Sequence, residues 1–137
     1  MSVPAAMPDR VTLLGYRKLL PLLAVAVAYV LCKFKPARLR RAMQMLRRGA
    51  RPADIDQARA ARASVVAVSV ACAGQGCLQR SIATAVLCRM RGTWPTWCTG
   101  VRTSPFQAHA WVQVDDQLID EPQPNGYYIP TMVIPPE

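Results

Sequence analysis

The sequence predicts an α+β domain in which helices precede an antiparallel sheet. Two observations indicate this class. Up to Gly92 the apolar residues recur at helical spacings of three and four, and beyond Gly92 they alternate with polar residues as in strands. Because all the helices come before all the strands, an α+β arrangement is favoured over a parallel one. The 137 residues, 52% of them hydrophobic, suffice for about one globular domain with its own core.

The first fifty residues are predicted to form an apolar and basic helical segment ahead of a core over residues 51–137. Residues 1–10 contain two prolines and no periodicity, which indicates a loose tail. A helix is expected from Leu13 to about Leu31. It includes a run of 14 uncharged residues, fewer than the roughly 20 that cross a bilayer. We therefore expect a buried or surface-lying helix, with membrane contact as the weaker alternative.

A second helix is expected from Pro36 to a stop at Gly49. Its apolar residues recur at spacings of four and three, and its other faces carry arginines: Arg38, Arg40, Arg41, Arg47 and Arg48. Of the 17 Lys and Arg residues, 16 precede residue 92, so the chain has a basic front. A solvated face, or a dock for an acidic partner, is the favoured interpretation. An anionic membrane surface and nucleic acid are alternatives, and the latter lacks interleaved aromatic residues and a known motif.

Two more helices are expected before the sheet. Asp54 follows Pro52 at the position of an N-cap and precedes an alanine-rich stretch that favours helix as far as Gly74. After a glycine-rich break, "CLQRSIATAVLCRMRG" again has an apolar stripe and ends at Gly92. This helix therefore begins with Cys77 in its first turn.

Beyond Gly92 the pattern indicates strands. Residues 94–102 and 107–114 are predicted as antiparallel strands, and residues 117–121 as a third strand that returns after a turn at 115–116. The proline-rich remainder is expected to be an irregular tail or an edge strand.

The five cysteines predict neither a disulfide framework nor a metal site. Their number is odd, no pair has CxxC spacing, and His109 is the only histidine, which disfavours zinc. Cys72, Cys88 and Cys98 are expected to be structural thiols. This use of cysteine fits a reducing compartment, and so a cytoplasmic protein.

Cys77 and His109 are the candidate nucleophile and base. A thiol in the first turn of a helix lies near unpaired backbone N–H groups, which favour the thiolate. Strand alternation puts His109 on the face of Gln107 and Trp111, away from the aliphatic face that should meet the core. Each residue alone has a more ordinary structural interpretation. A cysteine, a histidine and then a carboxylate, in that order, are however one way to build a catalytic triad.

The third member depends on the register of the returning strand. If residues 115–116 form a two-residue turn, Trp111 faces Asp120, and Asp120 lies diagonal to His109. If Asp116 instead occupies a left-handed bulge position in a three-residue loop, Glu121 lies opposite His109. A slip of one residue exchanges the two carboxylates, so both remain candidates.

Three stretches of the sequence together resemble a known family: "RPADIDQARAARASVVAVSVAC", "GCLQRSIATAVLCRMRG" and "TGVRTSPFQAHAWVQVDDQLIDEP". They are similar to the transglutaminase-like cysteine peptidases of lasso peptide biosynthesis, closely over residues 51–122 and more loosely over residues 13–50. The combination of "CLQRS" with "PFQAHAWV" carries the resemblance. It implies a small papain-like core with the nucleophile at a helix N-terminus.

The resemblance also implies a function. Such a peptidase separates the leader of a ribosomally made precursor peptide from its core segment, whose free amino group then goes to a macrolactam synthetase. The family triad carries over onto Cys77, His109 and a carboxylate of "IDEP". The family usually has the acid next to the proline, which favours Glu121 over Asp120, and a glycine in the turn, where this chain has Asp116.

Partners and cofactors follow from the same resemblance. Some relatives carry a fused leader-recognition domain, for which this chain is expected to be too short, so a separate leader-binding protein is implied. Some relatives require ATP. No phosphate-loop pattern occurs in this sequence, and no bound cofactor is expected.

Further residues are assigned supporting roles. The backbone N–H of Cys77 and the side chain of Gln75 are expected to meet the oxyanion. Arg102, Phe106 and Trp111 are candidate substrate-binding residues, with a surface charge or a core wall as the structural alternatives. Two other functions stay open: acyl transfer to an amine by the same triad, and a catalytically inactive adaptor that docks partners.

Overall fold

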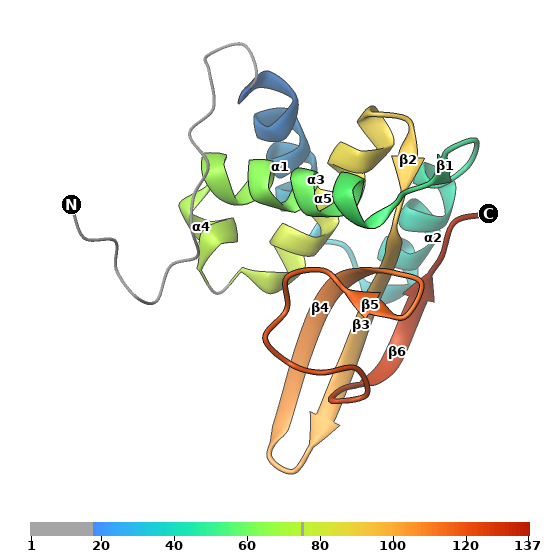
Figure 1. Cartoon of the computed structure of the whole chain (residues 1–137). Coiled ribbons are helices and arrows are strands. Elements are labelled where there is room, and N and C mark those ends of the chain that lie inside the picture. The colour runs from blue at the N-terminus through green and yellow to red at the C-terminus, as the bar shows by residue number, and fades with distance from the viewer. Residues whose placement is uncertain (1–17, 75) are drawn as a thin grey trace.

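The computed structural model describes residues 18–74 and 76–137, and it confirms the α+β class. Helices gather at one end of the molecule, and a four-stranded antiparallel sheet extends away from them (Figure 1). The predicted tail over residues 1–10, the predicted helix start at Leu13 and the candidate oxyanion residue Gln75 lie outside the described residues.

The elements follow the predicted order. The described helices are α1 (Leu19–Leu31), α2 (Pro36–Leu46), α3 (Ile55–Val68), α4 (Val70–Ala73) and α5 (Cys77–Met90). The strands are β1 (Arg51–Pro52), β2 (Thr93–Trp94), β3 (Thr96–Thr103), β4 (Phe106–Val114), β5 (Gln117–Leu118) and β6 (Ile129–Ile134). The sheet order is β5-β4-β3-β6, while β1 and β2 form a separate parallel pair. The proline-rich remainder therefore supplies an edge strand, β6.

Helix α5 forms the centre of the core. Every residue from Ser81 to Cys88 is buried, and the helix packs against α1 and α3 as well as β4. The indole of Trp97 in β3 donates a hydrogen bond of 3.0 Å to the Ser81 hydroxyl, and both side chains are buried. Since a buried indole N–H needs an acceptor, this bond fixes α5 on the sheet one turn after Cys77.

Helix α1 presents small residues to the core and large ones to the outside. Its buried residues are Pro21, Ala24, Ala28 and Leu31. Its exposed apolar residues include Leu19, Leu22, Leu23, Tyr29 and Val30. Small side chains allow close approach to α5, and the result is the expected surface-lying helix with one buried side. No helix within the described ranges is long and apolar enough to cross a membrane.

Helix α2 buries Leu39 and Met43, as its spacing predicted. Its basic face consists of four exposed arginines: Arg38, Arg40 and Arg41 in the helix, and Arg48 in the turn that follows it. Among the described residues, none of these four forms an ion pair. Arg47 differs, since it is half-buried and donates to the carbonyl oxygen of Pro135 at 2.9 Å.

Helix α3 begins as predicted but ends earlier. The Asp54 carboxylate accepts the Gln57 N–H at 2.7 Å, and the Gln57 side chain accepts the Asp54 N–H at 3.0 Å, which makes a capping box. The prediction of an unbroken helix to Gly74 is wrong. The backbone is extended at Ser69, whose hydroxyl accepts the Cys72 N–H at 3.2 Å and starts α4. Serine favours caps over helix interiors because its hydroxyl bonds nearby backbone groups.

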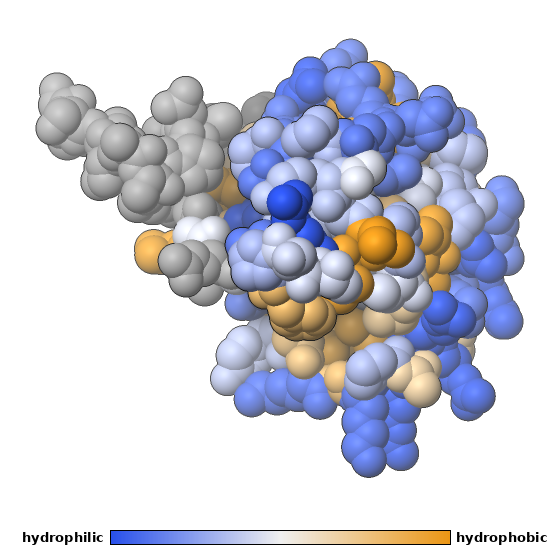
Figure 2. All heavy atoms as spheres, turned by 90° about the horizontal axis from the view of Figure 1, so that it is seen from below, coloured by the Kyte–Doolittle hydropathy of each residue, from blue (hydrophilic) through white to orange (hydrophobic). Residues whose placement is uncertain are grey.

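The two faces of β4 follow the predicted alternation at the end near the helices. Ala110 and Val112 are buried, in line with the expected core face. Ala108 on the same face is exposed, and Trp111 on the other face is buried because Tyr128 packs against it. Seen from below, hydrophobic residues gather beside the projecting strands and are bordered by hydrophilic ones (Figure 2).

Candidate active site

Cys77 is the first residue of α5, as predicted, and it is half-buried. The backbone N–H groups of the first helical turn have no partners within the helix and favour negative charge on a nearby atom. The backbone N–H of Ala110 in β4 donates a hydrogen bond to the Cys77 sulfur. The thiol therefore lies between a helix start and a strand, in surroundings that stabilise a thiolate.

His109 connects Cys77 to a carboxylate. Its Nε2 lies 2.6 Å from Oε1 of Glu121, and the ring also hydrogen-bonds with the Cys77 thiol. Because Nε2 is engaged by Glu121, Nδ1 is the ring nitrogen left for Cys77. The structure thus brings three of the predicted residues into one hydrogen-bonded series, in the order thiol, imidazole and carboxylate.

Glu121 reaches His109 by a route that the sequence did not predict. Val114 pairs with Gln117 and Gln113 with Leu118, which is the register of the two-residue turn. The three-residue loop with a left-handed Asp116 is wrong, since the residue with positive φ in the turn is Asp115, at 52°. Aspartate tolerates this conformation, so the shorter turn needs no glycine.

The strand then ends early, and this brings Glu121 inward. β5 stops at Leu118, and the Ile119 N–H donates to the Val112 carbonyl at 3.0 Å. Asp120 has a φ of 50°, so the alternation of a strand is broken there. Its carboxylate points to Arg59, with Nε and Oδ1 3.2 Å apart, and not to His109. The next residue, Glu121, carries the side chain that meets the imidazole.

Arg62 of α3 is a site residue that the sequence analysis missed. Its Nη2 lies 3.5 Å from Oε2 of Glu121, and the side chains of Arg62 and Glu121 are 13% and 3% exposed. Burial lowers the pKa of Arg62, followed by the charge of Arg80, while the Glu121 carboxylate opposes this shift. Glu121 therefore has two partners, with one oxygen on His109 and the other toward Arg62. The available signal was the pair of arginines, Arg59 and Arg62, one turn apart in an alanine-rich helix.

Two aromatic rings pack against the imidazole. The ring centroids of His109 and Tyr128 are 5.0 Å apart, and those of His109 and Trp111 are 5.9 Å apart, both in stacked geometry. Trp111 was a predicted site residue, whereas Tyr128 was not, because it lies in the proline-rich remainder. Its signal was the tyrosine pair at 127–128. The centroids of Trp111 and Tyr128 are themselves 5.9 Å apart, so the three rings form one aromatic cluster, and these contacts limit the rotation of the imidazole.

The two reactive groups shift each other's pKa. The hydrogen bond from His109 lowers the pKa of the Cys77 thiol, burial opposes this effect, and the Ala110 N–H lowers the pKa further. The hydrogen bond with Cys77, followed by that with Glu121, raises the pKa of His109 to about 9. Both directions favour a thiolate beside an imidazolium near neutral pH.

The other cysteines have the opposite character. All five cysteines are free thiols. Burial raises the pKa of Cys88 and of Cys98 to about 12, and it also raises the pKa of Cys72 and of Cys32. Among the described residues, no cluster of histidine, cysteine and carboxylate side chains is arranged to hold a metal ion.

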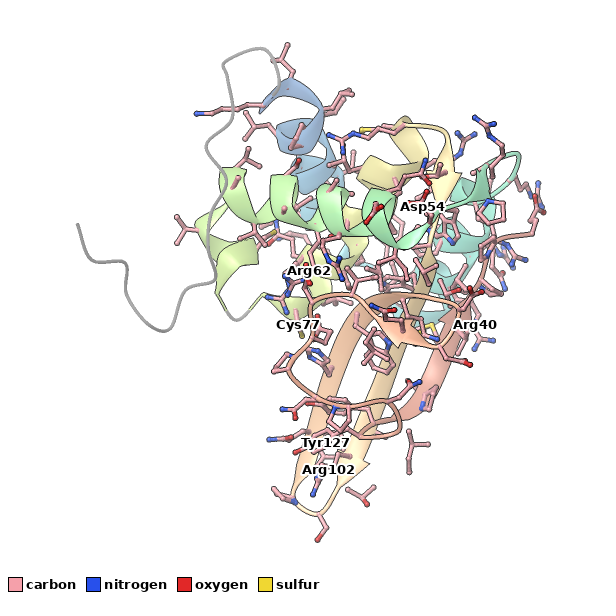
Figure 3. The ribbon with its side chains drawn as sticks, in the orientation of Figure 1. Arg40, Asp54, Arg62, Cys77, Arg102 and Tyr127 are labelled. Carbon is pink, nitrogen blue, oxygen red and sulfur yellow. The ribbon has the colours of Figure 1, made fainter. Side chains whose placement is uncertain are left out.

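Two predicted substrate-binding residues lie away from this site. Arg102 stacks over the ring of Tyr127, with 4.3 Å between the guanidinium carbon and the ring centroid. Figure 3 shows both residues near the far end of the hairpin from Cys77. Phe106 starts β4 next to the hairpin tip, and the residue is 71% exposed. The structure does not bring Arg102 or Phe106 to the thiol.

The arrangement supports nucleophilic chemistry by a thiolate, with the imidazolium as proton donor and the carboxylate holding the ring. Comparison with known families agrees with this chemistry. Residues 21–133 match the family model described as the transglutaminase-like superfamily. No curated protein and no solved structure matches the chain.

Proposed function

Because the chain belongs to the transglutaminase-like superfamily, we propose that it is a cysteine peptidase that removes the leader from a ribosomally synthesised lasso precursor peptide. The observation that carries the chemistry is the series Cys77, His109 and Glu121 at the start of α5. The choice of substrate rests on the resemblance of "CLQRS" and "PFQAHAWV" to that family of peptidases.

In the first step, the Cys77 thiolate attacks the carbonyl carbon of the last leader residue. A carbon–sulfur bond forms, and the carbonyl oxygen becomes an oxyanion that meets the Cys77 backbone N–H. When this intermediate collapses, the carbon–nitrogen bond breaks. The departing amine takes the proton of the His109 imidazolium, so the core segment leaves with a free amino group.

In the second step, water hydrolyses the thioester. The neutral His109 accepts a proton from the water as its oxygen attacks the carbonyl carbon. The carbon–sulfur bond then breaks, the leader departs as a free carboxylic acid, and the Cys77 thiolate is restored beside the imidazolium. Glu121 keeps the ring oriented in both steps, and Arg62 holds the second oxygen of that carboxylate.

The proposal includes partners. The precursor leader, or a separate leader-binding protein, would dock on the basic face of α2, whose four arginines are exposed. Charge complementarity of this kind mainly speeds association and is sensitive to salt. The freed core would pass to a macrolactam synthetase. ATP dependence is tested by running the assay below with and without ATP and Mg²⁺.

The test is a mass-spectrometric cleavage assay in H₂¹⁸O, with the cognate precursor and leader-binding protein. We expect wild type to release the leader with ¹⁸O in its new carboxylate, and Cys77→Ala to release none. Cys32→Ala is the matched control. Cys32 lies close enough to Cys77 for the two charges to interact, but its pKa is raised, so it is a poor nucleophile. The variant should cleave like wild type.

Other outcomes separate the alternative functions. A leader that carries an added amine in place of ¹⁸O would identify acyl transfer to an amine. Equal cleavage by wild type and Cys77→Ala would remove Cys77 from the reaction. No cleavage by wild type, together with no preferential alkylation of Cys77 by iodoacetamide, would identify an inactive adaptor.

A further inference from the structure

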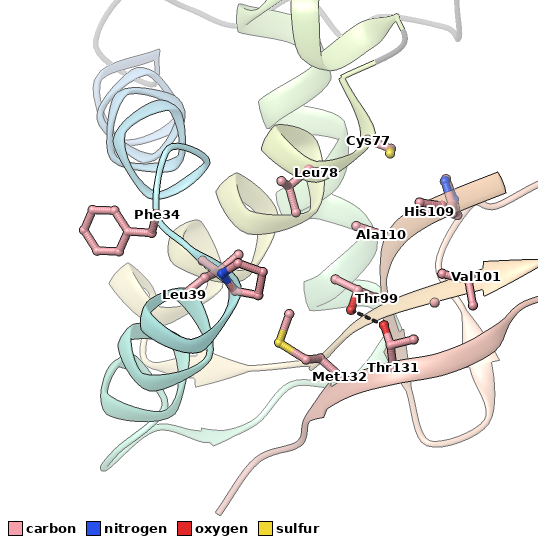
Figure 4. Close-up of a pocket in the computed structure, with 13 residues that line it drawn as sticks. Phe34, Leu39, Cys77, Leu78, Thr99, Val101, His109, Ala110, Thr131 and Met132 are labelled. Carbon is pink, nitrogen blue, oxygen red and sulfur yellow. Dashed lines mark hydrogen bonds between the residues drawn. The ribbon is translucent and has the colours of Figure 1, made fainter. Parts of the chain in front are cut away.

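An apolar pocket opens beside the candidate nucleophile. Its volume is about 280 Å³, and Cys77 forms part of its rim. The walls come from the start of α5, one face of the sheet, and the first turn of α2 with the link that precedes it. The side chains of Leu78 and Met132 point into the space between the helices and the strands, whereas the ring of Phe34 points away (Figure 4).

The pocket exists because the sheet is longer than the helix that covers it. α5 packs over the end of the sheet that contains Trp97 and Val112, which are buried. Farther along the same face, the strands carry small side chains, including Ala108 and Ala110. Small residues beyond the end of a covering helix leave unfilled space next to Cys77.

The lining suits an uncharged side chain. The Thr99 and Thr131 hydroxyls lie 2.9 Å apart and hydrogen-bond to each other, so they offer little to a polar ligand. Among the described lining residues, Cys77 and His109 are the two that can carry a charge, and they are engaged with each other and, for the imidazole, with Glu121. A charged ligand group would lose its hydration without gaining a partner.

Strand alternation decides which part of a substrate enters the pocket. His109 and Ala110 are neighbours in β4, so the imidazole and the Ala110 methyl group point to opposite faces. The imidazolium must reach the departing amine, so the segment after the scissile bond leaves on the face of the imidazole. The segment that stays bonded to sulfur is then directed to the opposite face, where the pocket lies.

We propose that this pocket binds an apolar side chain from one of the last two leader residues before the scissile bond. This assignment rests on the proposed function. Leucine, isoleucine, methionine and phenylalanine are the side chains of matching chemistry. The pocket thereby selects which bond of the precursor is placed on Cys77.

The test uses peptidyl vinyl sulfones, in which the electrophile replaces the scissile carbonyl and forms a thioether with Cys77. Two series carry leucine, alanine or aspartate at the last or the penultimate position. The rate of adduct formation is followed by intact-protein mass spectrometry. In one of the series we expect the leucine probe to react at least about tenfold faster than the aspartate probe.

Two variants locate this preference. Ala108→Leu fills the pocket from an exposed position and should reduce the preference for leucine over alanine to about onefold. Gln107→Leu is the matched control, since it adds the same side chain one residue earlier, on the other face of β4. It should keep the wild-type preference. Iodoacetamide, which needs no pocket, should alkylate Cys77 at the same rate in all three proteins.

The outcomes separate the pocket from the function. Equal rates for all probes, with rapid alkylation of Cys77 by iodoacetamide, would overturn the pocket and leave the nucleophile intact. The same holds if Gln107→Leu changes the preference as much as Ala108→Leu. Slow and nonselective alkylation of Cys77 by iodoacetamide would overturn both the pocket and the proposed function.

Discussion

Two ion pairs join α3 to the segment after β5, and they lie side by side. Arg59 and Arg62 are one helical turn apart, and their partners Asp120 and Glu121 are adjacent in the sequence. The distances are similar, at 3.2 Å and 3.5 Å. The surroundings of the two pairs differ. The side chains of Arg59 and Asp120 are 47% and 41% exposed, whereas those of Arg62 and Glu121 are 13% and 3% exposed.

The comparison shows that distance alone does not identify a functional pair. An exposed pair contributes roughly 0–1 kcal/mol to stability because water competes for both charges. A buried carboxylate depends on its partners, and Glu121 has one on each oxygen, His109 and Arg62. The shorter pair is therefore expected to be dispensable and the longer one to support the chemistry.

The largest expected difference is between Glu121→Gln and Asp120→Asn. Loss of the Glu121 charge removes the group that orients and stabilises the imidazolium, so the rate of leader release should fall on the order of 10²- to 10⁴-fold. Asp120→Asn should stay within about twofold of wild type, since it alters an exposed pair. Initial rates at saturating precursor measure both. A larger loss for Asp120→Asn would assign the orienting role to the wrong carboxylate.

A smaller difference is expected between the two arginines. Arg62→Met should lower the rate of leader release about 10- to 100-fold through a displaced Glu121, and the free energy of unfolding by about 1.5–3 kcal/mol. Arg59→Met should change that free energy by less than about 0.5 kcal/mol. Urea denaturation and leader release measure the two effects. If Arg62→Lys restores neither the rate of leader release nor the free energy of unfolding, a fixed guanidinium is required. Equal losses of rate and stability for Arg62→Met and Arg59→Met would contradict the comparison.

The pH dependence should separate the carboxylates next. The pKa of His109 is raised to about 9, so the imidazolium persists up to that pH, and leader release should fall about tenfold per unit above it. Glu121 is the second cause of the raised pKa, so Glu121→Gln should move this alkaline limb to lower pH, and Asp120→Asn should leave it in place. Alkylation by iodoacetamide follows the thiolate and should not fall above pH 9. A parallel fall in both reactions would indicate unfolding instead.

The smallest effect concerns salt. A double-mutant cycle on Arg59 and Asp120 should give a coupling of about 0.2–1 kcal/mol at 0.1 M NaCl, and nearly zero at 1 M, where screening acts within about 3 Å. The coupling energy between Arg62 and Glu121 should decrease less between 0.1 M and 1 M NaCl, because both side chains are largely shielded from solvent. Urea denaturation of each variant set measures both couplings. Equal salt sensitivity would mean that the two environments do not differ.

Local patterns predicted much of this molecule. The N-cap at Asp54 and the start of α5 at Cys77 depend on near neighbours in the sequence, and the structure agrees with both. The predicted core face of β4 agrees at Ala110 and Val112, whereas Ala108 is exposed because the helices do not reach it. The register of the returning strand could not be predicted from near neighbours in the sequence. It was decided by which aspartate adopts a positive φ, and Asp115 and Asp116 are equally suited to it by residue type.

The residues that were missed reach the site across the fold. Arg62 lies far before Glu121 in the sequence, and Tyr128 lies in a stretch with no period that would assign it a face. Their roles follow from how α3 and the segment after β5 pack around His109. The bulged register was a wrong route to Glu121, because the strand that it assumed ends at Leu118.

Gly100 of β3 pairs with His109, and the indole of Trp111 lies over it. A Cβ atom at position 100 would stand 2.8 Å from the Trp111 ring and 2.9 Å from the carbonyl oxygen of Ile129, and neither distance is tolerated. Relief at the ring requires a smaller residue at position 111. A bulky aromatic residue at position 111 should therefore be found among relatives only where position 100 is glycine, and this pairing is a criterion for recognising chains that build the imidazole site in the same way.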